Sequence, residues 1–140
     1  MIIGIWNQKN EGGIWEYNSQ EETVKSLDFA LHLYAVTYMK LVNISEKKLI
    51  YAVDEKVVDE NGKVGGNILV YDFDEKILMQ IQETNVTLPC YFDIVEKYNI
   101  LIGVNYGCDT NDEQTDSELT IYKINSSGLI KKKGKRLVSG

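Results

Sequence analysis

The sequence has little of what most local signals of chemistry require. Its 140 residues hold one proline, two cysteines, one histidine and one arginine. Two cysteines, Cys90 and Cys108, are too few for the disulfide framework of a small secreted protein, so we expect free thiols. With Pro89 as the single proline, the turns must depend on Gly, Asn and Asp.

Basic charge is also scarce. Lys and Arg number 15 against 21 Asp and Glu, which gives a formal net charge of −6. A nucleic-acid partner needs a clustered basic surface, so we expect none. No apolar run approaches the roughly 18 residues of a membrane span, and the opening MIIGIWNQ lacks the basic lead and cleavage site of a signal peptide. These absences predict a soluble, cytoplasmic protein without membrane partners.

Helical periodicity is missing as well. No segment keeps apolar residues at i, i+3, i+4 and i+7 for three turns. Residues 20–33 come nearest, but their alternation suits a strand equally. Elsewhere, short runs rich in Ile, Val, Leu and Tyr are separated by turn compositions such as SEKK, DENGKVGG and NSSG. The sequence therefore predicts an all-β fold.

The β segments repeat at an interval of about 50 residues. Val53 and Asp54 of LIYAVDE align with Val104 and Asn105 of LIGVNYG, an offset of 51 residues. The tyrosine of ILVYDF aligns with that of LTIYKI at the same offset. Four short antiparallel strands per interval of this length are the pattern of a β-propeller blade.

The repeat predicts a partial β-propeller with about two complete four-stranded blades plus three strands of a third. We expect one propeller domain over 1–140, divided into a partial closing blade at 1–31, a first complete blade at 32–84 and a second at 85–140. The strands of the complete blades are expected near 38–44, 49–54, 67–73 and 77–84, then near 91–96, 100–105, 118–124 and 129–138. A closed ring needs roughly four to eight blades. We therefore expect the opening part of a longer protein, which self-associates or pairs with missing blades.

A resemblance to a known family is carried by five segments: IIGIWNQKNEGGIWEY, YMKLVNISEKKLIYAVDE, GGNILVYDFDEKIL, LPCYFDIVEKYNILIGVNYG and LTIYKINSSGLI. In order and spacing they resemble the N-terminal part of the lactonase family of seven-bladed β-propellers, which includes the propeller-type 6-phosphogluconolactonases and the fungal carboxymuconate cyclases. The resemblance implies a hydrolase of a sugar lactone, such as 6-phosphogluconolactone, that works without metal or cofactor. The runner-up is a non-catalytic propeller that binds a small ligand or a protein.

The most specific pieces of the resemblance are Asp54-Glu55, Pro89-Cys90-Tyr91 and Asn105-Tyr106. Asp54 stands where the family more usually has asparagine, and Tyr91 where it usually has histidine. In a propeller, the loops between second and third strands and between outer and inner strands emerge on one face. The resemblance therefore implies that Glu55, Tyr91, Asn105 and Tyr106 bind substrate there.

Structural roles are the alternative for these residues. Glu55 could tie its loop to backbone amides, Asn105 could cap a turn, and Tyr106 could pack between blades. No residue is assigned as catalytic, because the resemblance implies that the imidazole and cationic groups of the family's active site fall in later blades.

Other constellations predict no further site. Cys90, Cys108 and His32 match no zinc spacing, so His32 is expected in a loop or between blades, with a rim contact to substrate as the alternative. DTNDEQ at 109–114 has Gln114 where a calcium loop needs glycine. KKKGKR at 131–136 is expected to protect an edge strand. A G-x-S-x-G elbow is lacking, which argues against a serine hydrolase.

Overall fold

The structure is a computed structural model that describes residues 1–5, 12–33, 35–58, 61–62, 64–84, 89–105, 109–110, 113–114 and 117–138. These residues form antiparallel strands and a single turn of 3-10 helix, η1 (Glu96–Tyr98). Among the described residues, no helix has the length and apolar character needed to cross a membrane. The all-β prediction is confirmed.

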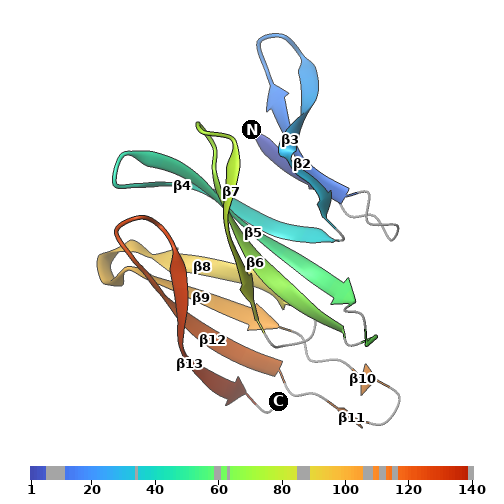
Figure 1. The fold of residues 1–140 in the computed structure, drawn as a ribbon, viewed down its shortest axis with the longest axis vertical. Coiled ribbons are helices and arrows are strands. Elements are labelled where there is room, and N and C mark those ends of the chain that lie inside the picture. The colour runs from blue at the N-terminus through green and yellow to red at the C-terminus, as the bar shows by residue number, and fades with distance from the viewer. Residues whose placement is uncertain are drawn as a thin grey trace.

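Three sheets follow one another along the chain (Figure 1). The first sheet contains β1 (Ile2–Ile5), β2 (Gly12–Asn18) and β3 (Thr23–Leu33). The second contains β4 (Val36–Ile44), β5 (Lys47–Val58), β6 (Val64–Asp72) and β7 (Ile77–Glu83). The third contains β8 (Pro89–Val95), β9 (Ile100–Asn105), β12 (Ser117–Ile124) and β13 (Ile130–Val138), and the small hairpin of β10 (Asp109–Thr110) and β11 (Glu113–Gln114) joins β9 to β12.

Each sheet is a meander in which strands adjacent in sequence pair with each other. The second sheet lies between the first and the third, with β4 beside β1 on one side and β5 beside β8 on the other (Figure 1). Sheets of four short strands stacked face to face are the blades of a propeller. The predicted partial propeller, with two four-stranded sheets and three strands of another, is confirmed. The ambiguous segment at 20–33 is strand β3, and its pairing with β2 continues to Leu33.

The strand register of the second and third sheets agrees with the offset of 51 residues between the repeats. Tyr38 faces Val53 in the second sheet, and Tyr91 faces Val104 in the third. In both sheets a bulge precedes that tyrosine in the inner strand. The third strands follow the same rule, because Val53 and Val104 are also opposite Ile68 and Leu119 respectively.

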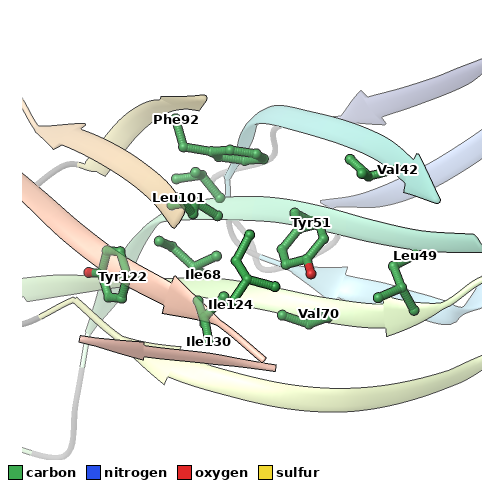
Figure 2. Close-up of a cluster of buried hydrophobic side chains, with 11 residues drawn as sticks. Val42, Leu49, Tyr51, Ile68, Val70, Phe92, Leu101, Tyr122, Ile124 and Ile130 are labelled. Atoms are coloured by element: carbon green, nitrogen blue, oxygen red, sulfur yellow. The ribbon is translucent and has the colours of Figure 1, made fainter. Parts of the chain in front are cut away.

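The core fills the two spaces between the sheets. Strand β5 buries both of its faces, so its sequence LIYAV is continuously apolar rather than alternating. One cluster packs the second sheet on the third (Figure 2): Val42, Leu49, Tyr51, Val53, Ile68, Val70, Phe92, Leu101, Tyr122, Ile124 and Ile130. The other packs it on the first sheet: Ile14, Leu27, Ala30, Val36, Ile50, Ala52, Leu69 and Tyr71.

Polar contacts fix the third sheet against the second. The Tyr51 hydroxyl donates a hydrogen bond of 2.6 Å to the carbonyl oxygen of Gly128. The Gln80 amide both donates to the carbonyl of Ile130 and accepts from its N–H, each at 2.7 Å. Gly128 has a φ of +85°, and a Cβ there would collide with Leu49. Glycine is therefore required at this turn both by its backbone and by the neighbouring sheet.

Replacing Gly128 by alanine should lower the free energy of unfolding by about 2–3 kcal/mol, because the new methyl group meets Leu49 in a strained backbone. Gly62 is the matched control, since its φ is +77° but nothing lies within 4 Å of its Cβ position. Gly62→Ala should cost only about 1 kcal/mol. Urea denaturation of both variants measures the difference. Equal losses would show that the backbone alone, and not the packing of the two sheets, fixes glycine at position 128.

Candidate functional site

The polar residues at which β5 stops pairing with β4 contact the entry of β4. The Asp54 side chain is 5% exposed, and its Oδ1 accepts a hydrogen bond of 2.7 Å from the N–H of Ala35. The N–H of Glu55 donates to the carbonyl oxygen of Ala35 at 2.9 Å. Beyond Asp54 the pairing of β5 with β6 shifts register before it resumes at Val57. This pair of residues therefore marks the place where β5 leaves the packed stack.

The backbone of Glu55 makes the tie to Ala35. Glu55 is half-buried, and this burial raises the pKa of its carboxyl group. The raised pKa means that the protein surroundings favour the neutral acid more than water does. Asp54 makes the kind of side-chain-to-amide contact that the structural alternative describes for Glu55, whose own role stays a prediction.

The entry of the third sheet is packed against the same end of the second. A Cβ on Gly66 would collide with the ring of Pro89 and lie 2.8 Å from the carbonyl oxygen of Glu55. Thr84 follows the end of β7, and its hydroxyl and N–H both donate to the carbonyl of Gly66, at 2.9 and 3.1 Å. The close approach of Pro89 to Gly66 brings Glu55 and the start of β8 to a common edge, which we call the rim.

Tyr91 lies just inside the rim on the inner strand β8. Its side chain is 45% exposed, and its ring packs on Tyr38 of the preceding inner strand with ring centroids 4.4 Å apart. Burial first, and then the neighbouring Tyr91, raise the pKa of Tyr38. Two residues further along, Lys40 Nζ and Asp93 Oδ1 form an ion pair of 2.9 Å between the same two strands. The inner strands thus present an aromatic pair beside a charged pair.

A small pocket lies between the second and third sheets below the rim. Its polar lining comes from Thr84, Tyr91, Asn105, Glu118, Thr120 and Tyr122. Asn105 is 6% exposed, and its Oδ1 accepts a hydrogen bond of 2.7 Å from the N–H of Glu118. The Thr120 hydroxyl in turn donates to Glu118 Oε1 at 3.0 Å. The pocket has room for roughly one water molecule.

The structure brings two of the four predicted substrate-binding residues, Tyr91 and Asn105, into this one pocket. Glu55 lies on the adjoining rim, through the contact of its carbonyl with Gly66. Tyr106, like Cys108, falls outside the described residues. His32 is placed only through its backbone, in β3 and not in a loop, so its predicted contacts stay predictions. Cys90 is half-buried, with its sulfur 3.5 Å from the carbonyl oxygen of Val104.

Sequence reasoning missed the buried acid and hydroxyl of the pocket. Glu118 is 8% exposed and Thr120 3% exposed, although both are polar. The signal was present in ELTIYKI, since a period of two places both residues on the same face as Tyr122 and Ile124. What the alternation could not show is that a carboxylate would be tolerated there, because its cationic partner Lys132 comes from strand β13.

The polar groups of this site are mostly oxygen atoms, which act as hydrogen-bond acceptors. The two lysines near it lie beside carboxylates: Lys132 Nζ is 4.0 Å from Glu118 Oε1, and Lys40 forms an ion pair with Asp93. Within the described ranges, no three His, Cys, Asp or Glu side chains are grouped so as to hold a metal ion. Such an arrangement can accept hydrogen bonds from hydroxyl groups and pack against a ring.

We predict that Asp54→Ala lowers the free energy of unfolding by about 1–3 kcal/mol, because the buried N–H of Ala35 loses its acceptor. Asp54→Asn keeps an oxygen at this place and should cost less than about 1 kcal/mol. Asp74→Ala, at an exposed turn position, is the control and should be near neutral. Chemical denaturation of the three variants is the measurement, and an Asn variant as unstable as the Ala variant would contradict the assigned role.

Comparisons with known proteins agree with this architecture. The family model described as "Lactonase, 7-bladed beta-propeller" matches residues 1–139. A search of curated proteins and a search of solved structures each found no significant match. The family match covers nearly the whole chain and includes all three sheets. The chain therefore belongs to the lactonase family of seven-bladed β-propellers.

Proposed function

We propose that this chain forms part of the substrate site of a sugar-lactone hydrolase, with 6-phosphogluconolactone as the first substrate to test. The observation that carries the proposal is the family match over residues 1–139. The geometry supports it, because an exposed aromatic ring, a half-buried carboxylate and a small pocket with several polar lining residues lie at one edge of adjacent sheets. The cytoplasmic location expected from the sequence belongs to this proposal.

In the proposed site the four predicted residues bind and orient the sugar. Glu55 accepts hydrogen bonds from sugar hydroxyls, Tyr91 packs along the ring, and Asn105 and Tyr106 make further contacts with the ligand. Hydrolysis itself adds water across the lactone: the water oxygen bonds to the carbonyl carbon, the ring C–O bond breaks, and the ring oxygen gains a proton. This step needs a base and donors to the developing oxyanion. We assign neither to residues 1–140.

The rest of the proposal concerns how the site is completed. The three sheets are parts of one propeller domain, divided near residues 31 and 84, and further blades or a second copy complete the stack. The remaining groups around the ligand come from those blades. No metal or cofactor is assigned to the reaction.

A non-catalytic ligand- or protein-binding propeller is the second candidate. Several polar groups of the rim are already hydrogen-bonded within the protein, including Asp54 to Ala35 and Asn105 to Glu118. Polar side chains that already hydrogen-bond the protein's own backbone are less free to act on a substrate. Such a scaffold is therefore suited to binding a ligand without catalysing a reaction.

The two candidates are separated by assaying the complete protein on 6-phosphogluconolactone and glucono-lactone, with the spontaneous hydrolysis subtracted. The hydrolase should open at least one of them, and Glu55→Gln should raise KM by about tenfold, the loss of one charge-assisted hydrogen bond. Glu75→Gln, in an exposed turn, is the control and should leave KM unchanged. Lactone binding without turnover would favour the second candidate, and no interaction with either lactone would contradict the proposal.

The pH dependence gives an independent check on Glu55. Burial raises its pKa, so the carboxylate gains its proton at a higher pH than an exposed glutamate does. If the ionised form accepts the sugar hydroxyls, KM should rise as the pH falls through this raised pKa. Glu55→Gln should flatten that part of the profile, whereas a limb that persists in Glu55→Gln would assign it to another group.

A further inference from the structure

The second and third sheets differ at two corresponding positions around a shared tyrosine. At an offset of 51 residues, the positions Ala52, Asp54 and Tyr71 correspond to Gly103, Asn105 and Tyr122. In the second sheet, after burial, the charge of Asp54 contributes to the raised pKa of Tyr71, so a carboxylate lies near that phenol. In the third sheet the corresponding side chain is a neutral amide, whose Oδ1 accepts the N–H of Glu118.

Tyr122 is buried, and its hydroxyl lacks a hydrogen bond of good geometry among the described residues. Its side chain is 1% exposed, and burial raises its pKa to about 12. Among the described residues its hydroxyl oxygen makes no hydrogen bond of good geometry, although the Thr120 side chain is close enough to lower its pKa. In Figure 2 that oxygen is turned away from Ile68 and Ile124. Buried hydroxyls are almost always hydrogen-bonded, either to protein or to ordered water.

Space for a partner exists beside the same ring. Gly103 on β9 pairs with Thr120 on β12 and with Phe92 on β8. A Cβ on Gly103 would lie 3.7 Å from the Tyr122 ring and 3.8 Å from Ile68, which are ordinary contacts. The lack of that methyl group leaves room in the pocket that Gly103, Tyr122 and Thr120 line. In the second sheet Ala52 fills the corresponding position.

We propose that this pocket between the sheets is a binding site for one water molecule, hydrogen-bonded to the Tyr122 hydroxyl and to the polar side chains around it. A buried water needs two to four polar partners and about the volume of one water. The pocket has about this volume, and Tyr122, Thr120, Glu118 and Asn105 are among the residues that line it, beside apolar groups such as Val53 and Ile68. This site goes beyond the proposed function, because the water is bound with or without a substrate and with or without catalysis.

A crystal structure of the protein at a resolution that shows ordered solvent is the direct test. We expect a single peak in the pocket, about 2.6–3.2 Å from the hydroxyl oxygen of Tyr122. An empty pocket would overturn the proposal, and so would a protein group occupying the same place.

Variants at Gly103 test the site in solution. Gly103→Ala puts a methyl group beside the Tyr122 ring, in the proposed place of the water, and should lower Tm by about 3–6 °C, because the buried hydroxyl of Tyr122 loses its hydrogen bond to that water. Gly103→Ser returns a hydroxyl to the pocket and should stay within about 2 °C of the parent protein. Gly134→Ala is the matched strand control, since nothing lies within 4 Å of its Cβ position. It should not lower Tm as Gly103→Ala does.

A double-variant cycle with Tyr122→Phe assigns the effect to the hydroxyl. With phenylalanine at position 122 no buried hydroxyl is left without a partner, so Gly103→Ala should no longer lower Tm. If Gly103→Ala instead raises Tm in both backgrounds, the pocket is a dry cavity that a methyl group fills, and the proposal is wrong. An equal loss in both backgrounds would also overturn it, because the cost would then be steric.

Discussion

The burial of both faces of the second strand in a sheet is the constraint on which the rest of the structure depends. Leu49, Tyr51 and Val53 of β5 pack against the third sheet, while Ile50 and Ala52 pack against the first. Because neither face reaches water, a polar side chain can appear only where the strand leaves the stack or where a neighbour supplies its partners. A polar residue in β5 therefore indicates the place where the strand leaves the stack, and not only a preference for solvent.

The rim follows directly from that constraint. Asp54 is the first polar residue after the apolar run of β5, and it stands where pairing with β4 ends. Asn105 has the same place at the end of β9, opposite Pro89. The two side chains make different contacts, one with the amide of Ala35 and the other with the amide of Glu118. The repeat thus determines where a polar side chain occurs, and the neighbouring chain determines which backbone N–H that side chain accepts.

Much of this architecture was predictable from the sequence, because it rests on local rules. Alternation, turn residues and the offset between Tyr71 and Tyr122 predicted the strands and the stacking of similar sheets. The pocket was not predictable in this way. Its walls come from Ile68 on one sheet and from Gly103 and Glu118 on two strands of the next, so it depends on contacts between sheets. Glycine in a strand signals an unusual packing without saying what fills the space.

The same distinction separates residues that build the rim from those that can recognise a ligand. Asp54 and Asn105 are almost fully buried, and their side-chain oxygens accept backbone N–H groups, so a ligand would have to compete with the fold for them. Glu55 and Tyr91 differ, because Glu55 is only half-buried and Tyr91 is 45% exposed. If the lactonase family scaffold is used for recognition here, discrimination between ligands should depend on these two side chains more than on Asn105.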